Sequence, residues 1–255
     1  MKVSRGRHIG SGQGDLSFSV RGAISRSVRD SVGHLYHTQR TDTRAPLPPI
    51  NFIKHPLKQR LKIGLIATGV DNIVPSDEVL TALDETVSLC QALGHNVLPT
   101  AFPPSVIEMG NTMLIARAQT LLNYYGSVAQ RLGRPVDERE FEPWTLQQMA
   151  YCQTISETQS TNAVRHIKKM TDDVLNMHRQ FDLLLMHVLA TRPVKLGYLQ
   201  SSKQIDFEEM IDRNKSYVSY TTVFNIAGSP AMSVPVSYTH LRAHETKANL
   251  VCRLL

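Results

Sequence analysis

Apolar side chains recur along the chain at two spacings, and together they predict short strands alternating with longer helices. The segment KIGLIA at residues 62–67 is short and apolar, and residues 95–98 form a second such run. Between them, apolar residues return every three or four positions, which is the spacing of one helix face. Ser76 and Gly94 flank this stretch, and these residue types commonly begin and end helices. Strand, helix and strand with short joints predict two parallel strands with a right-handed crossover.

Longer helical patterns follow this unit, and a shorter one precedes it. Apolar positions at helical spacing predict helices over residues 104–132 and 145–178. A further helix is predicted at 28–37, with Ser25 or Ser27 as its N-terminal cap. The stretch 41–56 has no periodicity and is rich in proline, so it is predicted to be a surface linker.

Three further apolar segments are predicted to be buried strands. They are residues 182–188, 223–227 and 231–236. The second ends at Gly228, Ser229 and Pro230, where glycine permits an unusual backbone angle and proline fixes the next one. The sequence therefore predicts an α/β fold: a mixed β-sheet containing 62–67, 95–98, 182–188 and 231–236, covered by helices.

Composition limits the classes of function. The chain has 255 residues, of which 42% are hydrophobic, enough for a sizeable core. Its net charge of +6 is spread without a long Lys/Arg block, so we expect no nucleic acid partner. No apolar run approaches membrane-spanning length, so we expect no membrane association. The three cysteines lie far apart, which favours a reducing compartment, and we expect a cytoplasmic protein.

Three segments resemble, in the same order, motifs of the amidase signature family. FNIAGSPAMSVP at 224–235 is similar to N-x-x-G-x-P-A-x-x-x-P, MKVSRGR at 1–7 to G-L-K-P-T-R-G-R, and GAISRSVRD at 22–30 to G-P-x-A-R-S-V-x-D. LATRPVKLGYL at 189–199 resembles the group that includes 6-aminohexanoate-cyclic-dimer hydrolases. The resemblance implies an incomplete amidase signature fold, with residues 1–236 forming the C-terminal part of an amidase domain.

The resemblance also implies a chemistry. Family members hydrolyse amide bonds with a nucleophilic serine, a second serine whose peptide bond is cis, and a lysine base, because a hydroxyl is a weak nucleophile until a base takes its proton. In the family these groups lie upstream of the MKVSRGR-like run, and no G-S-S-G-G-S or G-T-D-x-G-G-S stretch occurs here. No catalytic residue is therefore assigned, and neither Ser11 nor Ser229 takes that role. We expect a hydrolase fragment that is inactive alone; the alternative is a non-catalytic binding or structural protein that keeps the amidase shell.

Four residues are expected near the substrate. Thr191, Asn225, Gly228 and Ser229 lie at the predicted ends of strands, where α/β proteins place binding groups. The expected substrate of the full-length enzyme is a small-molecule amide, and a homodimer is left open. The ten histidines form no HExxH motif, so no metal site and no cofactor are expected.

Two features depart from the family pattern. Met186 and His187 stand where relatives usually place threonine or serine and proline. No acid or nucleophile partner is evident for His187, so a packed, hydrogen-bonded histidine is favoured over a catalytic one. Residues 237–255 show no strand alternation and resemble translated adapter sequence. They are expected to be non-native and to pack poorly.

Overall fold

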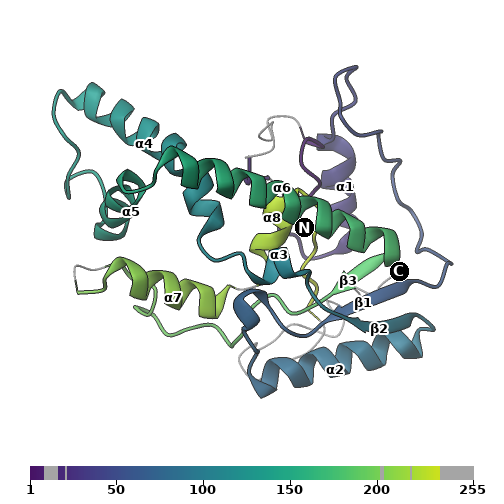
Figure 1. Cartoon of the computed structure of the whole chain (residues 1–255). Coiled ribbons are helices and arrows are strands. Elements are labelled where there is room, and N and C mark those ends of the chain that lie inside the picture. Colours follow the sequence, from purple (N-terminus) through teal and green to yellow (C-terminus); the bar gives the residue numbers. More distant parts are fainter. Residues whose placement is uncertain (9–16, 21, 202–203, 219, 236–255) are drawn as a thin grey trace.

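A computed structural model of the chain is shown in Figure 1. It describes residues 1–8, 17–20, 22–201, 204–218 and 220–235. The segment 237–255, predicted to be a non-native tail, lies outside the described residues.

The described residues form a three-stranded parallel sheet. Its strands are β1 (Lys62–Ile66), β2 (Asn96–Thr100) and β3 (Leu183–Leu185), in the order β2-β1-β3. Both neighbours run parallel to β1. The helix α2 (Asp77–Ala92) connects β1 to β2, and Gly94 just beyond it takes a positive φ of 85°. The predicted strand–helix–strand unit is therefore confirmed. It could be predicted because each of its sequence signals lies within or next to the element that it defines.

The first long helical pattern is divided in two. A short helix, α3 (Pro104–Ile107), is followed by the long helix α4 (Thr112–Leu132). Gly110 lies between them with a φ of 49°, a left-handed conformation in the turn that separates the two helices. The apolar spacing continues across the break, so periodicity alone could not detect it.

The second long pattern is divided in the same way. It forms α5 (Pro143–Gln153) and α6 (Glu157–Gln180). Ser156 begins α6 with a capping box: its side chain accepts from the backbone N–H of Gln159, whose own side chain accepts from the backbone N–H of Ser156. This reciprocal cap fixes the start of a new helix.

Two smaller helices complete the N-terminal and C-terminal parts. The helix α1 (Val28–Thr38) begins at Ser27, whose side chain accepts from the backbone N–H of Asp30. The prediction of a helix at this place is therefore confirmed, with Ser27 as the cap. The helix α7 (Phe207–Tyr217) is capped by Asp206.

Three strand predictions need correction. Residues 223–227 belong to a helix, α8 (Thr222–Ala227), because Gly228 ends a helical turn in the left-handed conformation, with φ 68°. Of the segment predicted at 231–236, residues 231–235 are described, and they contribute only an isolated antiparallel bridge between Ala231 and Lys2, since the flanking prolines lack the N–H groups that extend a ladder. The strand predicted at 182–188 covers only the three residues of β3.

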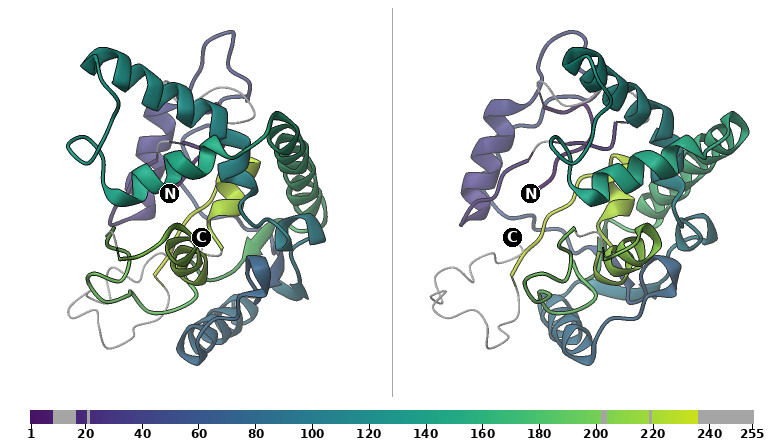
Figure 2. Two further views of the ribbon diagram at one scale, coloured as in Figure 1. Left: turned by 60° about the vertical axis from the view of Figure 1, so that its left-hand side comes forward. Right: turned by 90° about the vertical axis from the view of Figure 1, so that its left-hand side faces the viewer.

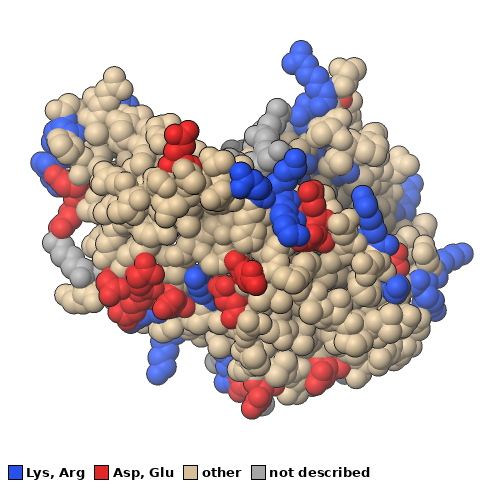
Figure 3. All heavy atoms as spheres, viewed as in Figure 1, with Lys and Arg blue, Asp and Glu red and all other residues tan. Residues whose placement is uncertain are grey.

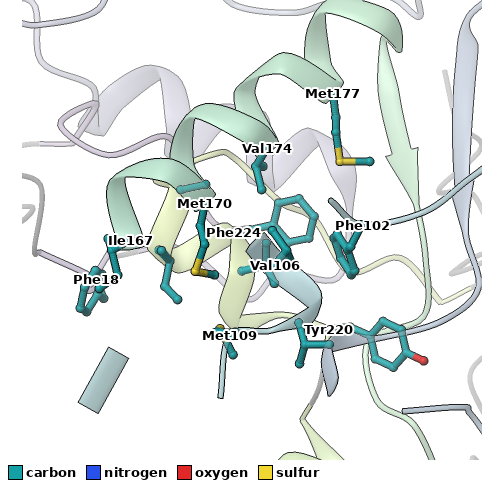
Figure 4. Close-up of a cluster of buried hydrophobic side chains, with 14 of the residues drawn as sticks. Phe18, Phe102, Val106, Met109, Ile167, Met170, Val174, Met177, Tyr220 and Phe224 are labelled. Carbon is teal, nitrogen blue, oxygen red and sulfur yellow. The ribbon is translucent and has the colours of Figure 1, made fainter. Parts of the chain in front are cut away.

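The core lies where α6 packs against α8, α3 and the carboxyl end of the sheet. Figure 4 shows side chains from α6 pointing toward Phe224 of α8 and Val106 of α3. In Figure 1, α6 lies on one side of the sheet and α2 on the other, and the views of Figure 2 agree. The side chains that α6 buries are Ala163, Ile167, Met170, Val174 and Met177.

Candidate functional site

The first residues of the chain pair with the turn that follows α8. The backbones of Lys2 and Ala231 exchange two hydrogen bonds, with N···O distances of 2.7 and 2.9 Å. The N–H of Arg5 donates to the carbonyl of Gly228 at 2.9 Å. Two of the segments that resemble family motifs, at opposite ends of the chain, therefore form one structural unit.

The side chain of Lys2 strengthens this contact. Its Nζ donates to the carbonyl oxygens of Phe224 at 2.9 Å and Ser229 at 2.5 Å. Burial, followed by the positive charge of Arg5, lowers the pKa of Lys2 to about 8. The ammonium group therefore binds carbonyl oxygens in a partly buried environment that favours its neutral form more than water does.

Arg5 binds the same helix end from its own position. Its guanidinium donates to the carbonyls of Asn225 at 3.1 Å and Ile226 at 2.5 Å. The last carbonyls of a helix have no partners inside the helix and form the negative end of its dipole. Two cations thus satisfy groups that α8 itself leaves open.

Three of the four residues expected near the substrate lie in this unit. Asn225 is half-buried in α8, Gly228 ends that helix and Ser229 is 4% exposed. The Oγ of Ser229 is buried and has no hydrogen-bond partner among the described residues. Their predicted placement at strand ends is wrong, because Asn225 lies within a helix and Gly228 and Ser229 follow it.

Thr191 lies elsewhere. It is exposed in the loop after β3, where its hydroxyl donates to the carbonyl of Arg192 at 3.0 Å. Within the described residues, no hydrogen bond joins it to Asn225, Gly228 or Ser229. The structure therefore brings three of the predicted residues together and leaves the fourth separate.

His187 follows β3 at the carboxyl edge of the sheet. Both of its ring nitrogens are buried without hydrogen-bond partners in the described part of the chain. Burial lowers the pKa of His187 to about 4, so the ring is neutral near pH 7. Its packing against Tyr220 agrees with the structural interpretation, but the hydrogen bonds expected for it are not found among the described residues.

Tyr220 was not singled out by the sequence, although it is fully buried at the same edge of the sheet. Its hydroxyl lies 3.0 Å from the carbonyl of Ile73 and 3.3 Å from that of Ala67. Burial raises the pKa of Tyr220 to about 12, so the phenol stays protonated. It connects the loop after β1 with the segment that leads into α8. No pattern signals this role, because a single tyrosine in a polar stretch gives no periodicity.

Lys2 and Arg5 are the other residues that sequence reasoning missed. The MKVSRGR segment was recognised as a motif, but no role was assigned to its cations. The motif was the one sequence signal that could have pointed to them. Two basic residues three positions apart do not form part of an apolar face, so hydrophobic packing would not explain their presence.

Two hollows border the helices α4 and α6. One, of about 250 Å³, is lined by Thr112, Ile115 and His166 together with polar side chains of α6. The other, of about 280 Å³, includes Leu122 and Cys152 in its lining. Neither is lined by the residues expected near the substrate.

Groups of possible metal ligands and membrane-spanning helices were both sought in the described part of the chain. There, no group of three or more His, Cys, Asp or Glu side chains is arranged to hold a metal ion. No helix of that part is long and apolar enough to cross a bilayer. Figure 3 shows a face where acidic groups gather over α7, while lysines and arginines occur in separate groups.

The sequence and the structure of this chain are similar to those of known proteins. A putative amidase, AmiC, of Mycobacterium tuberculosis is 27% identical over 229 residues, covering 86% of this chain and 45% of AmiC. The structure of 6-aminohexanoate cyclic dimer hydrolase aligns with a TM-score of 0.74 at 17% identity, over 89% of this chain and 51% of that one. A bacterial aryl acylamidase of the amidase signature family aligns with a TM-score of 0.67 at 18% identity, over 89% and 49%.

These comparisons identify the fold and show how much of the relatives' length the chain covers. The structural alignments show that the described α/β architecture is the amidase signature fold. The chain spans about half the length of the relatives it matches. The Amidase family matches the sequence over residues 1–243, which is nearly the whole chain. This chain therefore belongs to the amidase family.

Proposed function

We propose that this chain is the C-terminal part of a hydrolase that cleaves the carbon–nitrogen bond of a small-molecule amide. The observation that supports this most directly is the family match over residues 1–243, combined with coverage of about half of each relative. The three motif-like segments lie in the family's order, and two of them dock on each other at α8.

The proposed mechanism divides the work between this chain and residues outside it. A nucleophilic serine, a relay serine and a lysine base would come from a preceding segment, since their motifs do not occur here. The present chain would contribute the substrate side of the site. Asn225 and Ser229 are the residues proposed to contact the amide, because the two basic side chains hold the backbone at both of them: Arg5 at the carbonyl of Asn225 and Lys2 at that of Ser229. Thr191 remains a proposed contact from the separate loop after β3.

The location and partners of the protein follow from the same proposal. The cysteines Cys90 and Cys152 are free and buried, which fits a reducing compartment such as the cytoplasm. The proposed partner is a small-molecule amide rather than a nucleic acid or a membrane.

The test compares the chain with an extended protein. The genomic sequence preceding Met1 is determined, and any extended reading frame is expressed beside residues 1–255. We expect the extended protein to hydrolyse aryl or cyclic amides and to be labelled by a serine-directed phosphonate. We expect the 255-residue chain to do neither, because it lacks the nucleophile and the base.

Variants of the extended protein test the substrate contacts. Asn225→Ala and Ser229→Ala should each change turnover, whereas Ser216→Ala, in an exposed position of α7, should not. Amide hydrolysis by the purified 255-residue chain would contradict the proposal that the nucleophile and the base come from a preceding segment. An extended frame without serine and lysine motifs would favour the non-catalytic alternative.

A further inference from the structure

The turn at 228–231 is held almost entirely from the N-terminal segment. Lys2 pairs with Ala231 through the backbone and with two carbonyls through its side chain. Arg5 binds Gly228 through the backbone and two other carbonyls through its guanidinium. A helix of six residues has little stability of its own, so these contacts decide how α8 ends.

Within the described residues, the charged groups found beside Lys2 are positive. Arg5 is the charged side chain that acts on it, and the α-amino group of Met1 lies on the neighbouring residue, where it donates to the carbonyl of Ala23 at 2.6 Å. The sequence of α8, TVFNIA, contains no ionisable side chain, and neither do residues 22–24 or 229–231. Among the described residues, no carboxylate forms an ion pair with Lys2.

The side-chain hydrogen bonds of Lys2 are stronger while its amine is protonated. Hydrogen bonds from a charged donor are roughly twice as strong as those from a neutral one. The half-buried Lys2 has only carbonyl acceptors to offset the loss of water, and burial lowers its pKa into the mildly alkaline range. Arg5 stays charged at any such pH, because the guanidinium does not lose its proton in proteins.

We infer that Lys2 and Arg5 are positioning residues for the turn 228–231, and that the proton on Lys2 controls how firmly this turn is held. In mildly alkaline solution the Lys2 bonds to Phe224 and Ser229 weaken, while those of Arg5 remain. The turn then loosens at Ser229, whereas the end of α8 stays fixed at Ile226. The consequence for substrate rests on the proposed function, because Asn225 and Ser229 are its proposed contacts.

The experiment follows the acceptor carbonyls of the complete 255-residue chain by ¹³C nuclear magnetic resonance between pH 6.5 and 9.5. Carbonyl signals report hydrogen-bond acceptance and, unlike amide protons, do not disappear by exchange at high pH. In the wild-type chain we expect the carbonyls of Phe224 and Ser229 to shift with a midpoint near 8. The carbonyl of Ile226, which Arg5 binds, should shift several-fold less.

Two variants separate the effect of Lys2 from that of its neighbour Met1, whose α-amino group is a second charged group beside it. Lys2→Arg keeps a permanent charge, so the Ser229 carbonyl should lose its titration although Met1 is unchanged. Lys2→Met removes the charge, so Ser229 should resemble the alkaline wild type at every pH. A Lys2→Arg chain that titrates like wild type, or a wild-type chain without titration, would overturn the inference. If Lys2→Met does not fold, the wild type and Lys2→Arg still decide.

These signals are read without substrate, so they are independent of the proposed function. If the extended protein fails to hydrolyse amides but Ser229 titrates as described, only the proposed function has failed. If the extended protein is active, its KM should rise above pH 8 with little change in kcat, and Lys2→Arg should flatten that rise.

Discussion

The imidazole of His187 meets the phenol ring of Tyr220 edge to face, with the ring centroids 4.1 Å apart and the planes at 69°. This contact occurs at the carboxyl edge of the parallel sheet, where the loops after β1 and β3 approach the segment before α8 (Figure 1). Because neither nitrogen of His187 has a partner in the described structure, the ring is held as an apolar group. Protonation would place a charge against the buried Tyr220.

The first prediction is a loss of stability in mild acid. A histidine in an unfolded chain has a pKa of about 6.5, whereas burial lowers the folded pKa of His187 to about 4. Between these values the unfolded state binds more protons, so the free energy of unfolding falls as the pH drops through this window. Since His187 is only partly buried, we expect a loss of about 1–2 kcal/mol after solvent screening. Urea denaturation at pH 7.5, 5.5 and 4.5 measures it.

His187→Phe is the matched variant for this prediction. It keeps an aromatic ring against Tyr220 but removes the titrating group, so the pH dependence between 6.5 and 4 should become shallower. The remaining slope would include His178, whose pKa burial also lowers. An unchanged slope in His187→Phe would show that the acid sensitivity arises elsewhere.

The second prediction concerns the hydroxyl of Tyr220. Tyr220→Phe removes the donor to the carbonyl of Ile73, which also accepts from the N–H of Gly69 and so keeps one partner. We expect a loss of about 1 kcal/mol in the free energy of unfolding, the usual net value of one hydrogen bond. Tyr217→Phe is the control, because no hydrogen bond of its hydroxyl is found within the described structure, and it should change stability little. Equal losses in both variants would contradict a specific role for Tyr220.

The sequence predicted best what is determined locally. The unit of β1, α2 and β2 was found because strand length, helix periodicity and the cap residues lie within a few positions of each other. The helix α8 was predicted as a strand, since a short apolar run has no measurable period and fits either element. Its helical form depends on how it packs against α6 and on the side chains of Lys2 and Arg5.

In the candidate site, too, the features set by local sequence were predicted and those that depend on distant contacts were not. The motif FNIAGSPAMSVP predicted that Asn225, Gly228 and Ser229 lie near one another, and the structure brings them together. Asn225 lies in α8, and Gly228 and Ser229 follow it. The motif did not show that Lys2 and Arg5 hold this turn, because a hydrogen bond between residues more than two hundred positions apart has no local sequence signal. His187 was predicted inside the strand at 182–188, whereas it follows β3, and its lack of hydrogen bonds depends on the complete packing of the sheet edge.

The third prediction compares two serines that begin helices. Ser156 forms a capping box at the start of α6, whereas the side chain of Ser76 makes no cap bond at the start of α2. Ser156→Ala should reduce the free energy of unfolding by about 1 kcal/mol. Ser76→Ala should have a smaller effect, since it removes a buried hydroxyl that has no partner in the described structure. Thermal or urea unfolding of both variants tests this, and a larger loss in Ser76→Ala would contradict it.

The last prediction separates backbone strain from steric contact at the turn after α8. Gly228 and Gly133 each end a helix in the left-handed conformation, with φ values of 68° and 66°. In both, the N–H donates to the carbonyl three residues earlier at 3.3 Å. Their surroundings differ: a Cβ at Gly228 would lie 3.0 Å from the Cβ of Arg5, whereas nothing lies within 4 Å of a Cβ at Gly133.

Replacement by alanine should therefore have unequal effects. Gly133→Ala introduces only the unfavourable backbone angle, so we expect a loss of about 1 kcal/mol. Gly228→Ala adds a contact of 3.0 Å with the Cβ of Arg5, which must then shift and strain its bonds to α8, so we expect a loss of about 2–3 kcal/mol. Urea denaturation of the two variants measures the difference. Equal losses would show that Arg5 yields freely, and would therefore also weaken its assignment as a positioning residue.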